Sequence, residues 1–121
     1  APPIIHSLLQ MLQNNTSLLE LDIECNKLGD EGAIHVSTML RCNSTLRFLA
    51  CDDNDIGFTG WQAVSQSILH KNIALHHLPF PWRDFGRLNL SKNRRWKMEQ
   101  SLVKMVQQLQ ENQHTSAVVY H

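Results

Sequence analysis

Apolar residues recur along the chain at a fixed interval, and the polar residues between them recur as well. The stretch LLELDIECNKLGDEG, residues 18–32, matches LRFLACDDNDIGFTG, residues 46–60, at an offset of 28 positions. The shared pattern is L-x-x-L-x-L-x-x-N-x-L-G-x-x-G, with isoleucine or cysteine at some leucine positions. A third copy starts at Leu75, and a partial copy precedes the first. Self-similarity at this interval is typical of repeat proteins.

Within one repeat the interval between successive apolar residues changes from two positions to three or four positions. Leu21 and Ile23 alternate with acidic residues, which predicts a short strand with one buried face. Asn26 follows, where an amide side chain can satisfy backbone groups of a turn. A helix is then predicted by the spacing of Ala33, Val36, Met39 and Leu40. Each repeat is therefore a strand, a turn and a helix, and successive strands must pair in parallel.

Glycine and asparagine mark the points where the backbone changes direction. Gly29 and Gly57 are expected to adopt backbone angles that a side chain would resist. A left-handed conformation is expected where the helices end, at Asn15, Asn43 and Asn72.

The repeats divide the chain into five parts. Residues 1–17 hold the helix of a truncated repeat, so we expect further repeats upstream. Residues 18–45 and 46–74 are full repeats, and residues 75–112 are a terminal repeat with a capping helix. We expect a frayed tail at residues 113–121.

Two features predict where the array stops. Pro79 and Pro81 each remove a backbone donor from the third strand, which suits a terminal edge. A final helix, from Ser91 or Asn93 to Gln110, is predicted to cover the end of the core with an apolar stripe. The stripe consists of Met98, Leu102, Met105, Val106 and Leu109.

One strand and one helix cannot bury their own apolar face, so the repeats must stack. The pattern over residues 18–72 resembles leucine-rich repeats of the ribonuclease-inhibitor type. The resemblance implies an α/β fold, namely a right-handed solenoid with a curved parallel sheet inside and helices outside. We expect about three strands and a C-terminal capping helix. A doubly wound sheet would not require identical residues at identical offsets.

The end of the chain carries a more specific resemblance. LHKNIALHHLPFPWRDF, residues 69–85, followed by MEQSLVKMVQQLQENQ, residues 98–113, resembles the closing repeat of CARMIL proteins. NNTSLLELDI and CNSTLRFL are similar to the C-terminal domain of tropomodulin and leiomodin. These families are cytosolic and act on actin-filament ends, directly or through capping protein. The resemblance implies a cytoplasmic, non-catalytic scaffold for protein partners, cytoskeletal ones among them. CARMIL's capping-protein-binding motif lies outside its repeats and does not occur here.

Composition and charge are those of a globular protein, with 42% hydrophobic and 18% charged residues. The net charge is zero, but residues 1–60 carry eight acids and three bases, and residues 61–121 carry the reverse. This asymmetry bears on how a partner is oriented. The odd number of cysteines, three, favours a reducing compartment and hence the cytoplasm.

The outward positions of the strands are the candidate binding surface, since solenoids commonly bind partners on this concave face. Phe48 is the most informative member, because an outward aromatic residue is a candidate anchor. A merely solvated surface is the alternative. The candidate protein-binding residues are Glu20, Asp22, Glu24, Phe48, Asp52 and His77.

A second candidate contact patch is basic and consists of Arg87, Lys92, Arg94, Arg95 and Lys97. Only Trp96 is interleaved with it, so nucleic acid is not expected. A weak contact with acidic lipid, an acidic protein partner and a solvated helix start remain as alternatives, and self-association stays open. Trp61 and Trp82 are expected to pack against helices.

Catalysis has little support in the sequence, which lacks a phosphate loop, a Cys-x-x-Cys pair and a nucleophile elbow. His76 and His77 are adjacent on a strand and point in opposite directions, so no metal site is expected. No cofactor is expected either. The alternative function is a GTPase-activating or other enzyme-regulatory module, although nothing here corresponds to the catalytic arginine of the Ran activator.

Overall fold

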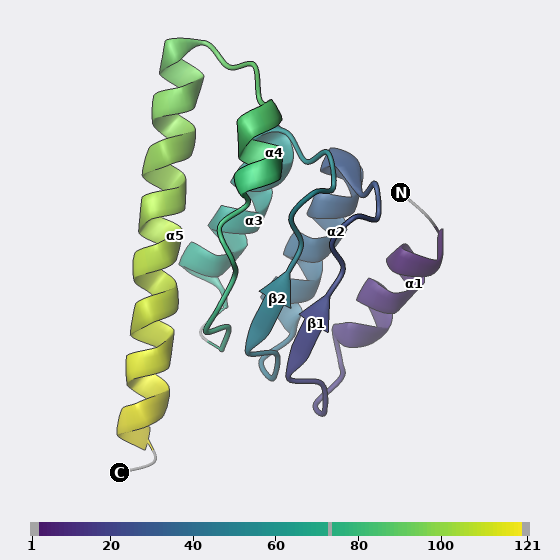
Figure 1. Ribbon diagram of the computed structural model, residues 1–121. Helices are drawn as coiled ribbons and strands as arrows, with labels where there is room; N and C mark the ends of the chain where they lie inside the picture. Colours follow the sequence, from purple (N-terminus) through teal and green to yellow (C-terminus); the bar gives the residue numbers. More distant parts are fainter. Residues whose placement is uncertain (1–2, 73, 120–121) are drawn as a thin grey trace.

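The computed structural model describes residues 3–72 and 74–119, with side chains up to residue 115. Its elements, in chain order, are α1 (Pro3–Leu12), β1 (Glu20–Asp22), α2 (Gly29–Cys42), β2 (Phe48–Ala50), α3 (Phe58–His70), α4 (Trp82–Arg87) and α5 (Lys92–Val119). Helices α1, α2 and α3 lie in a row behind the strands, and α5 stands at the end opposite α1 (Figure 1).

The two strands pair in parallel, as the repeat predicts. Their register places Leu21 opposite Leu49, and an isolated parallel bridge joins Phe48 to His77. Three strands were expected, but the described third copy contributes only this bridge. Pro79 follows two residues after the bridge and has no amide hydrogen, so the ladder cannot continue there.

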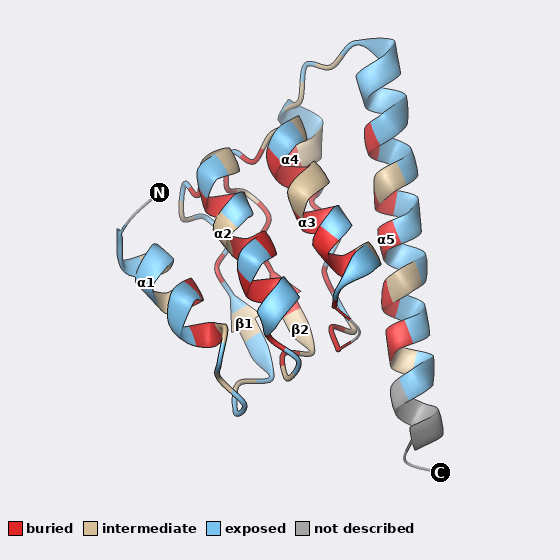
Figure 2. Cartoon of the chain, turned by 180° about the vertical axis from the view of Figure 1, so that it is seen from behind, coloured by how far each residue is buried: buried red, intermediate tan, exposed pale blue. Residues whose placement is uncertain are grey.

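The core lies between the strands and the helices. Figure 2 shows buried positions on one side of α2, α3 and α5 and exposed positions on the other. The predicted helix face of the first full repeat is completely buried at Ala33, Val36, Met39 and Leu40. Trp61 was predicted to pack against helices and is 1% exposed, whereas Trp82, for which the same was predicted, is 72% exposed.

A first ladder of asparagine side chains joins the turns that follow the strands. The Asn54 amide nitrogen donates to the carbonyl oxygens of Ile23 and Cys51, at 3.0 and 2.8 Å. The Asn54 side-chain oxygen accepts a hydrogen bond from the backbone N–H of Asn26 at 2.7 Å. Asn26 occupies the equivalent position one repeat earlier, and its side-chain amide also donates to the carbonyl oxygen of Ile23. The predicted role of these amides in the turns is confirmed.

A second ladder joins the helix ends. Asn72 donates to the carbonyl oxygen of Asn43 at 3.0 Å, and Asn112 of α5 donates to that of Leu75 at 2.9 Å. Asn43 is extended, with φ −88° and ψ 130°, so the left-handed conformation expected there was wrong. The amide groups of these residues, rather than a special backbone shape, explain their recurrence.

The two repeat glycines serve different purposes. Gly29 has φ +63°, the left-handed region that favours glycine. Gly57 has φ −96° and ψ −164°, so the unusual angles expected of it are absent. Its N–H donates to an Asp30 carboxylate oxygen at 2.7 Å, and a Cβ there would lie 3.3 Å from that carboxylate. Close approach between repeats therefore favours glycine at this position.

The last third of the chain differs most from the expectation. Helix α4 was not predicted, and α5 extends to Val119 rather than ending at Gln110. The frayed tail expected from residue 113 is helical through Val119, and the Gln113 amide donates to the carbonyl oxygen of His76 at 2.7 Å. None of the described helices combines the length and the apolar character needed to cross a membrane.

Candidate functional site

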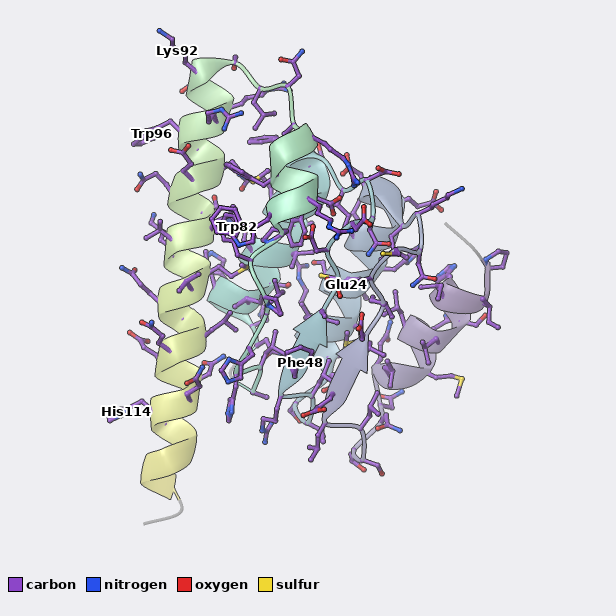
Figure 3. All side chains as sticks on the ribbon, viewed as in Figure 1. Glu24, Phe48, Trp82, Lys92, Trp96 and His114 are labelled. Atoms are coloured by element: carbon purple, nitrogen blue, oxygen red, sulfur yellow. The ribbon has the colours of Figure 1, made fainter. Side chains whose placement is uncertain are left out.

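The outward side chains of the strands form the candidate site, here called the sheet face: Glu20, Asp22, Glu24, Phe48 and His77. The register places Glu20, Phe48 and His77 in one row across the sheet. The three acids and His77 are exposed, and Phe48 is half-buried. In Figure 3 the labelled Glu24 and Phe48 lie on the side of the molecule where the strands are uncovered.

The acids of the sheet face form no ion pair with any residue that the structure describes. Partial burial, followed by the charge of Asp22, raises the pKa of Glu24 above its ordinary value. The neighbouring carboxylates of Asp22 and Glu24 repel each other, and a cation that approaches them relieves this repulsion.

Asp52 has a structural role instead of the predicted surface role. It is 8% exposed, and its carboxylate accepts hydrogen bonds from the backbone N–H groups of Arg83 at 3.1 Å and Asp84 at 3.0 Å. These N–H groups belong to the first turn of α4, where helix donors lack internal partners. Asp52 therefore caps α4 and does not face a partner.

Arg87 is also committed within the molecule. Its guanidinium lies 2.6 Å from a carboxylate oxygen of Asp53, 3.5 Å from Asp84 and 3.7 Å from Asp55. A hydrogen bond from the Cys25 thiol and the pairing with Arg87 lower the pKa of Asp53 to about 2. Arg87 closes a cluster of acids beside α4 and is not part of a free basic patch.

The Asp53 pairing predicts a pH dependence of stability. The folded-state pKa lies below the ordinary value of 3.8, so the stabilising contribution is present above about pH 4 and is lost as pH falls toward 2. The Asp53→Asn variant should lack this component of acid destabilisation, and thermal unfolding at pH 5, 4, 3 and 2 measures it. The Asp55→Asn variant, at a side chain 70% exposed, is the control and should keep the wild-type dependence.

The other predicted basic residues surround the start of α5 and are exposed. The guanidinium of Arg94 lies 5.4 Å from the Phe58 ring centre, and that of Arg95 lies 5.4 Å from the Phe85 ring centre. Figure 3 places the labelled Lys92 at the far end of α5 from Phe48. Lys97 lines a hollow with Trp96. The structure thus separates this patch from the sheet face.

Sequence reasoning missed an apolar groove between residues 80–85 and α5. The groove has a volume of 310 Å³, and Phe80, Phe85, Leu102, Val103 and Val106 line it. Val106 had been assigned to the buried stripe, but it is 40% exposed. The sequence did carry a signal for the groove, because the predicted apolar stripe of α5 is wider than the part of the helix that packs on the core.

Two further features adjoin this groove. The Trp82 ring lies against Phe80 at a tilt of 46°, with ring centres 4.2 Å apart, and its side chain is exposed near α5 (Figure 3). A hollow of 370 Å³ is lined by Phe48, His77, Leu78 and Pro79, and Pro79 directly precedes Phe80 of the groove in the chain. Apolar surface therefore extends from Phe48 on the sheet face toward α5.

The structure gives no indication that reactive side chains of the described residues serve catalysis or metal binding. Cys51 is buried in the core, and burial raises the pKa of its thiol. Within the described ranges, no three His, Cys, Asp or Glu side chains gather as a metal site would require. The arrangement suits recognition by shape and charge.

Residues 14–37 match the family model described as Leucine Rich repeat. The Rho GTPase-activating protein gacW of Dictyostelium discoideum is 35% identical over 103 residues, which is 85% of this chain and 9% of that protein. Protein CARMIL of the same organism is 42% identical over 83 residues, 66% of this chain and 8% of that protein. The human capping protein, Arp2/3 and myosin-I linker protein 3 is 31% identical over 80 residues, 66% of this chain and 6% of that protein.

A solved structure of leiomodin-1 actin-binding site 2 is similar in fold, with a TM-score of 0.66. The match covers 99% of this chain and 80% of that chain at 14% identity, so it shows the fold alone. Residues 14–37 thus match a leucine-rich repeat, and the chain resembles CARMIL in sequence and a leiomodin domain in fold. It spans less than a tenth of the length of the sequence relatives named above.

Proposed function

We propose that this chain is a non-catalytic scaffold that binds a protein partner through the sheet face. The observation that carries the proposal is the combination of three exposed carboxylates without a cation and a half-buried aromatic ring in one surface. Buried aromatic anchors surrounded by polar groups are typical of protein interfaces. The repeats would serve as a right-handed solenoid that holds this surface rigid.

The proposed setting is regulation of the actin cytoskeleton in the cytoplasm. Two of the similar proteins support it: one is a linker of capping protein, Arp2/3 and myosin-I, and the structural neighbour is an actin-binding site. The candidate partner is therefore actin, because the capping-protein-binding motif of CARMIL does not occur in this chain. The units of this scaffold would be residues 18–45, 46–74 and 75–112, preceded by the truncated repeat at 1–17.

A binding measurement tests this proposal. We expect the fluorescently labelled chain to bind monomeric actin in an anisotropy titration. Phe48→Ala and Asp22→Lys should each weaken binding about tenfold, since they remove the anchor and reverse a carboxylate.

Glu31→Lys supplies the matched control, because Glu31 is exposed on α2 and its substitution makes the same charge reversal away from the sheet face. It should bind as wild type does. Equal affinities for the wild type, Phe48→Ala and Asp22→Lys would show that the sheet face is not the binding surface.

The second candidate function is a regulatory region of a Rho GTPase-activating protein, which the match to gacW favours. The chain would then position a GTPase or its partner rather than contribute a catalytic group. Measuring GTP hydrolysis by a Rho GTPase with and without this chain separates the two candidates. The scaffold proposal predicts an unchanged rate, and acceleration would favour the second.

The basic residues Lys92, Arg94, Arg95 and Lys97 are proposed only as a secondary contact, for acidic protein or a weak contact with acidic lipid. Arg94 and Arg95 already lie over aromatic rings, which holds them in place but leaves their charge on the surface.

A further inference from the structure

We infer that α5 forms one wall of the binding site, and that the partner is a basic protein segment with a large apolar anchor. The cationic side chains of that segment bind Glu20, Asp22 and Glu24, and the anchor fills the groove between residues 80–85 and α5. The inference rests on the proposed function, because it uses the same sheet face. It adds the class of partner and a second contact surface.

The groove has the character of an anchor pocket. Phe80 and Phe85 meet edge to face with ring centres 5.7 Å apart, and they form its floor with Leu102. Val103 and Val106 of α5 form the wall, and they are 53% and 40% exposed. An apolar side chain inserted here would remove this surface from water, which is the main favourable term in most associations.

Trp82 extends the apolar surface at the edge of the groove. Its ring lies against Phe80 at a tilt of 46°, and the residue is 72% exposed overall. A large aromatic side chain left in water beside an apolar groove marks an interaction site more often than a scattered surface residue does.

Charge identifies the kind of segment that would occupy this surface. The acids beside α4 are already paired, since Asp53 and Asp84 lie within 3.5 Å of an arginine nitrogen. The acids of β1 have no such partner among the described residues. The negative potential that remains lies on the strand side of the groove and at Glu99, which lines the groove itself. It favours lysine or arginine in the partner.

The geometry sets the spacing in the partner. Glu20, Phe48 and His77 lie in one row, so the acids and the third strand are two strand intervals apart, about 10 Å. The helix wall adds about 10 Å. An extended segment covers this total of about 20 Å with about six residues, and a helix with about 13.

Selection of peptides on the intact chain tests the inference. A display library of random peptides about 16 residues long, enough for either conformation, is panned on the immobilised protein. We expect enriched peptides to carry lysine or arginine together with a large apolar residue. Their affinity, measured by anisotropy, should fall as salt is raised from 50 to 500 mM because the charge contacts are exposed.

Variants on α5 test the groove directly. Val103→Asn should weaken the selected peptides about fivefold, because it makes the wall polar. Gln100→Asn is the matched control on the same helix, since Gln100 lines the hollow on the other side with Phe58 and Trp96. Val103→Ile keeps the wall apolar and should bind as wild type does. Thermal unfolding of each variant verifies that the fold is retained.

The outcomes separate the inference from the proposed function. Peptides lost on Phe48→Ala but retained on Val103→Asn would overturn the inference and leave the sheet face as the binding site. Enrichment of acidic or uncharged peptides would overturn the charge assignment, and failure to enrich any peptide would overturn the inference as a whole. Direct binding of monomeric actin tests the proposed function independently of all these results.

Discussion

Replacing Met105 with aspartate is expected to lower the free energy of unfolding by about 4 kcal/mol, because the change creates a cavity and buries a charge. Met105 is 0% exposed and lies in the centre of α5, where the helix covers the end of the core. This loss approaches the total stability of a small domain, about 5–15 kcal/mol. Urea denaturation followed by circular dichroism measures it.

The same substitution two residues earlier is the control. Val103 is 53% exposed on the same helix, so Val103→Asp should change the unfolding free energy by no more than about 0.5 kcal/mol. Similar values for the two variants would mean that α5 does not pack on the core as the structure shows. A large difference would establish α5 as part of the fold.

Asn54→Ala is expected to destabilise the protein by about 3 kcal/mol, because several buried backbone groups lose their hydrogen bonds. The Asn54 side chain is fully buried and donates to the carbonyl oxygens of Ile23, Cys51 and Asp52. It also accepts from the backbone N–H of Asn26. Alanine leaves these groups unsatisfied in the interior. Denaturant unfolding again gives the magnitude.

Asn26 offers a matched comparison within the same ladder. It occupies the equivalent position one repeat earlier, is half-buried, and donates to the carbonyl oxygens of Ile23 and Glu24. Water can replace part of what its side chain supplies, so Asn26→Ala should cost about 1 kcal/mol. Equal costs at the two positions would contradict the view that Asn54 links adjacent repeats.

The structure of the repeated part of the chain was predictable, because residues 28 positions apart occupy equivalent positions in successive repeats. Leu21, Leu49 and the buried face of α2 follow directly from spacing, and the parallel register agrees with the 28-residue interval. The short third strand was foreseeable only in part. Prolines indicate where a ladder must end, but they do not reveal how few hydrogen bonds precede them.

The structure of the non-repeated part was harder to predict, because its residues have no equivalents in other repeats with which they could be compared. Asp52 looked like an outward strand position, yet a neighbouring segment, α4, places its N–H groups on that carboxylate. The same helix holds Arg87 close enough to pair with Asp53. Since α4 has no counterpart in the earlier copies, the sequence pattern could not indicate either contact.

The candidate site was predictable on its strand side and not on its helix side. Alternation placed Glu20, Asp22 and Phe48 outward because strand side chains point to alternate faces. The groove depends on how α5 is rotated about its axis. That rotation follows from the packing of Met98, Leu102 and Met105, which leaves Val103 and Val106 at the edge.

The most direct measurement is a map of the binding surface by amide chemical shifts of the labelled chain titrated with unlabelled monomeric actin. We expect changes at residues 20–24, 48–50 and 77 of the sheet face and at residues 99–107 along the groove, with little change on the outward sides of α1, α2 and α3. Changes confined to those outer helix surfaces, or no change at the sheet face, would contradict this expectation.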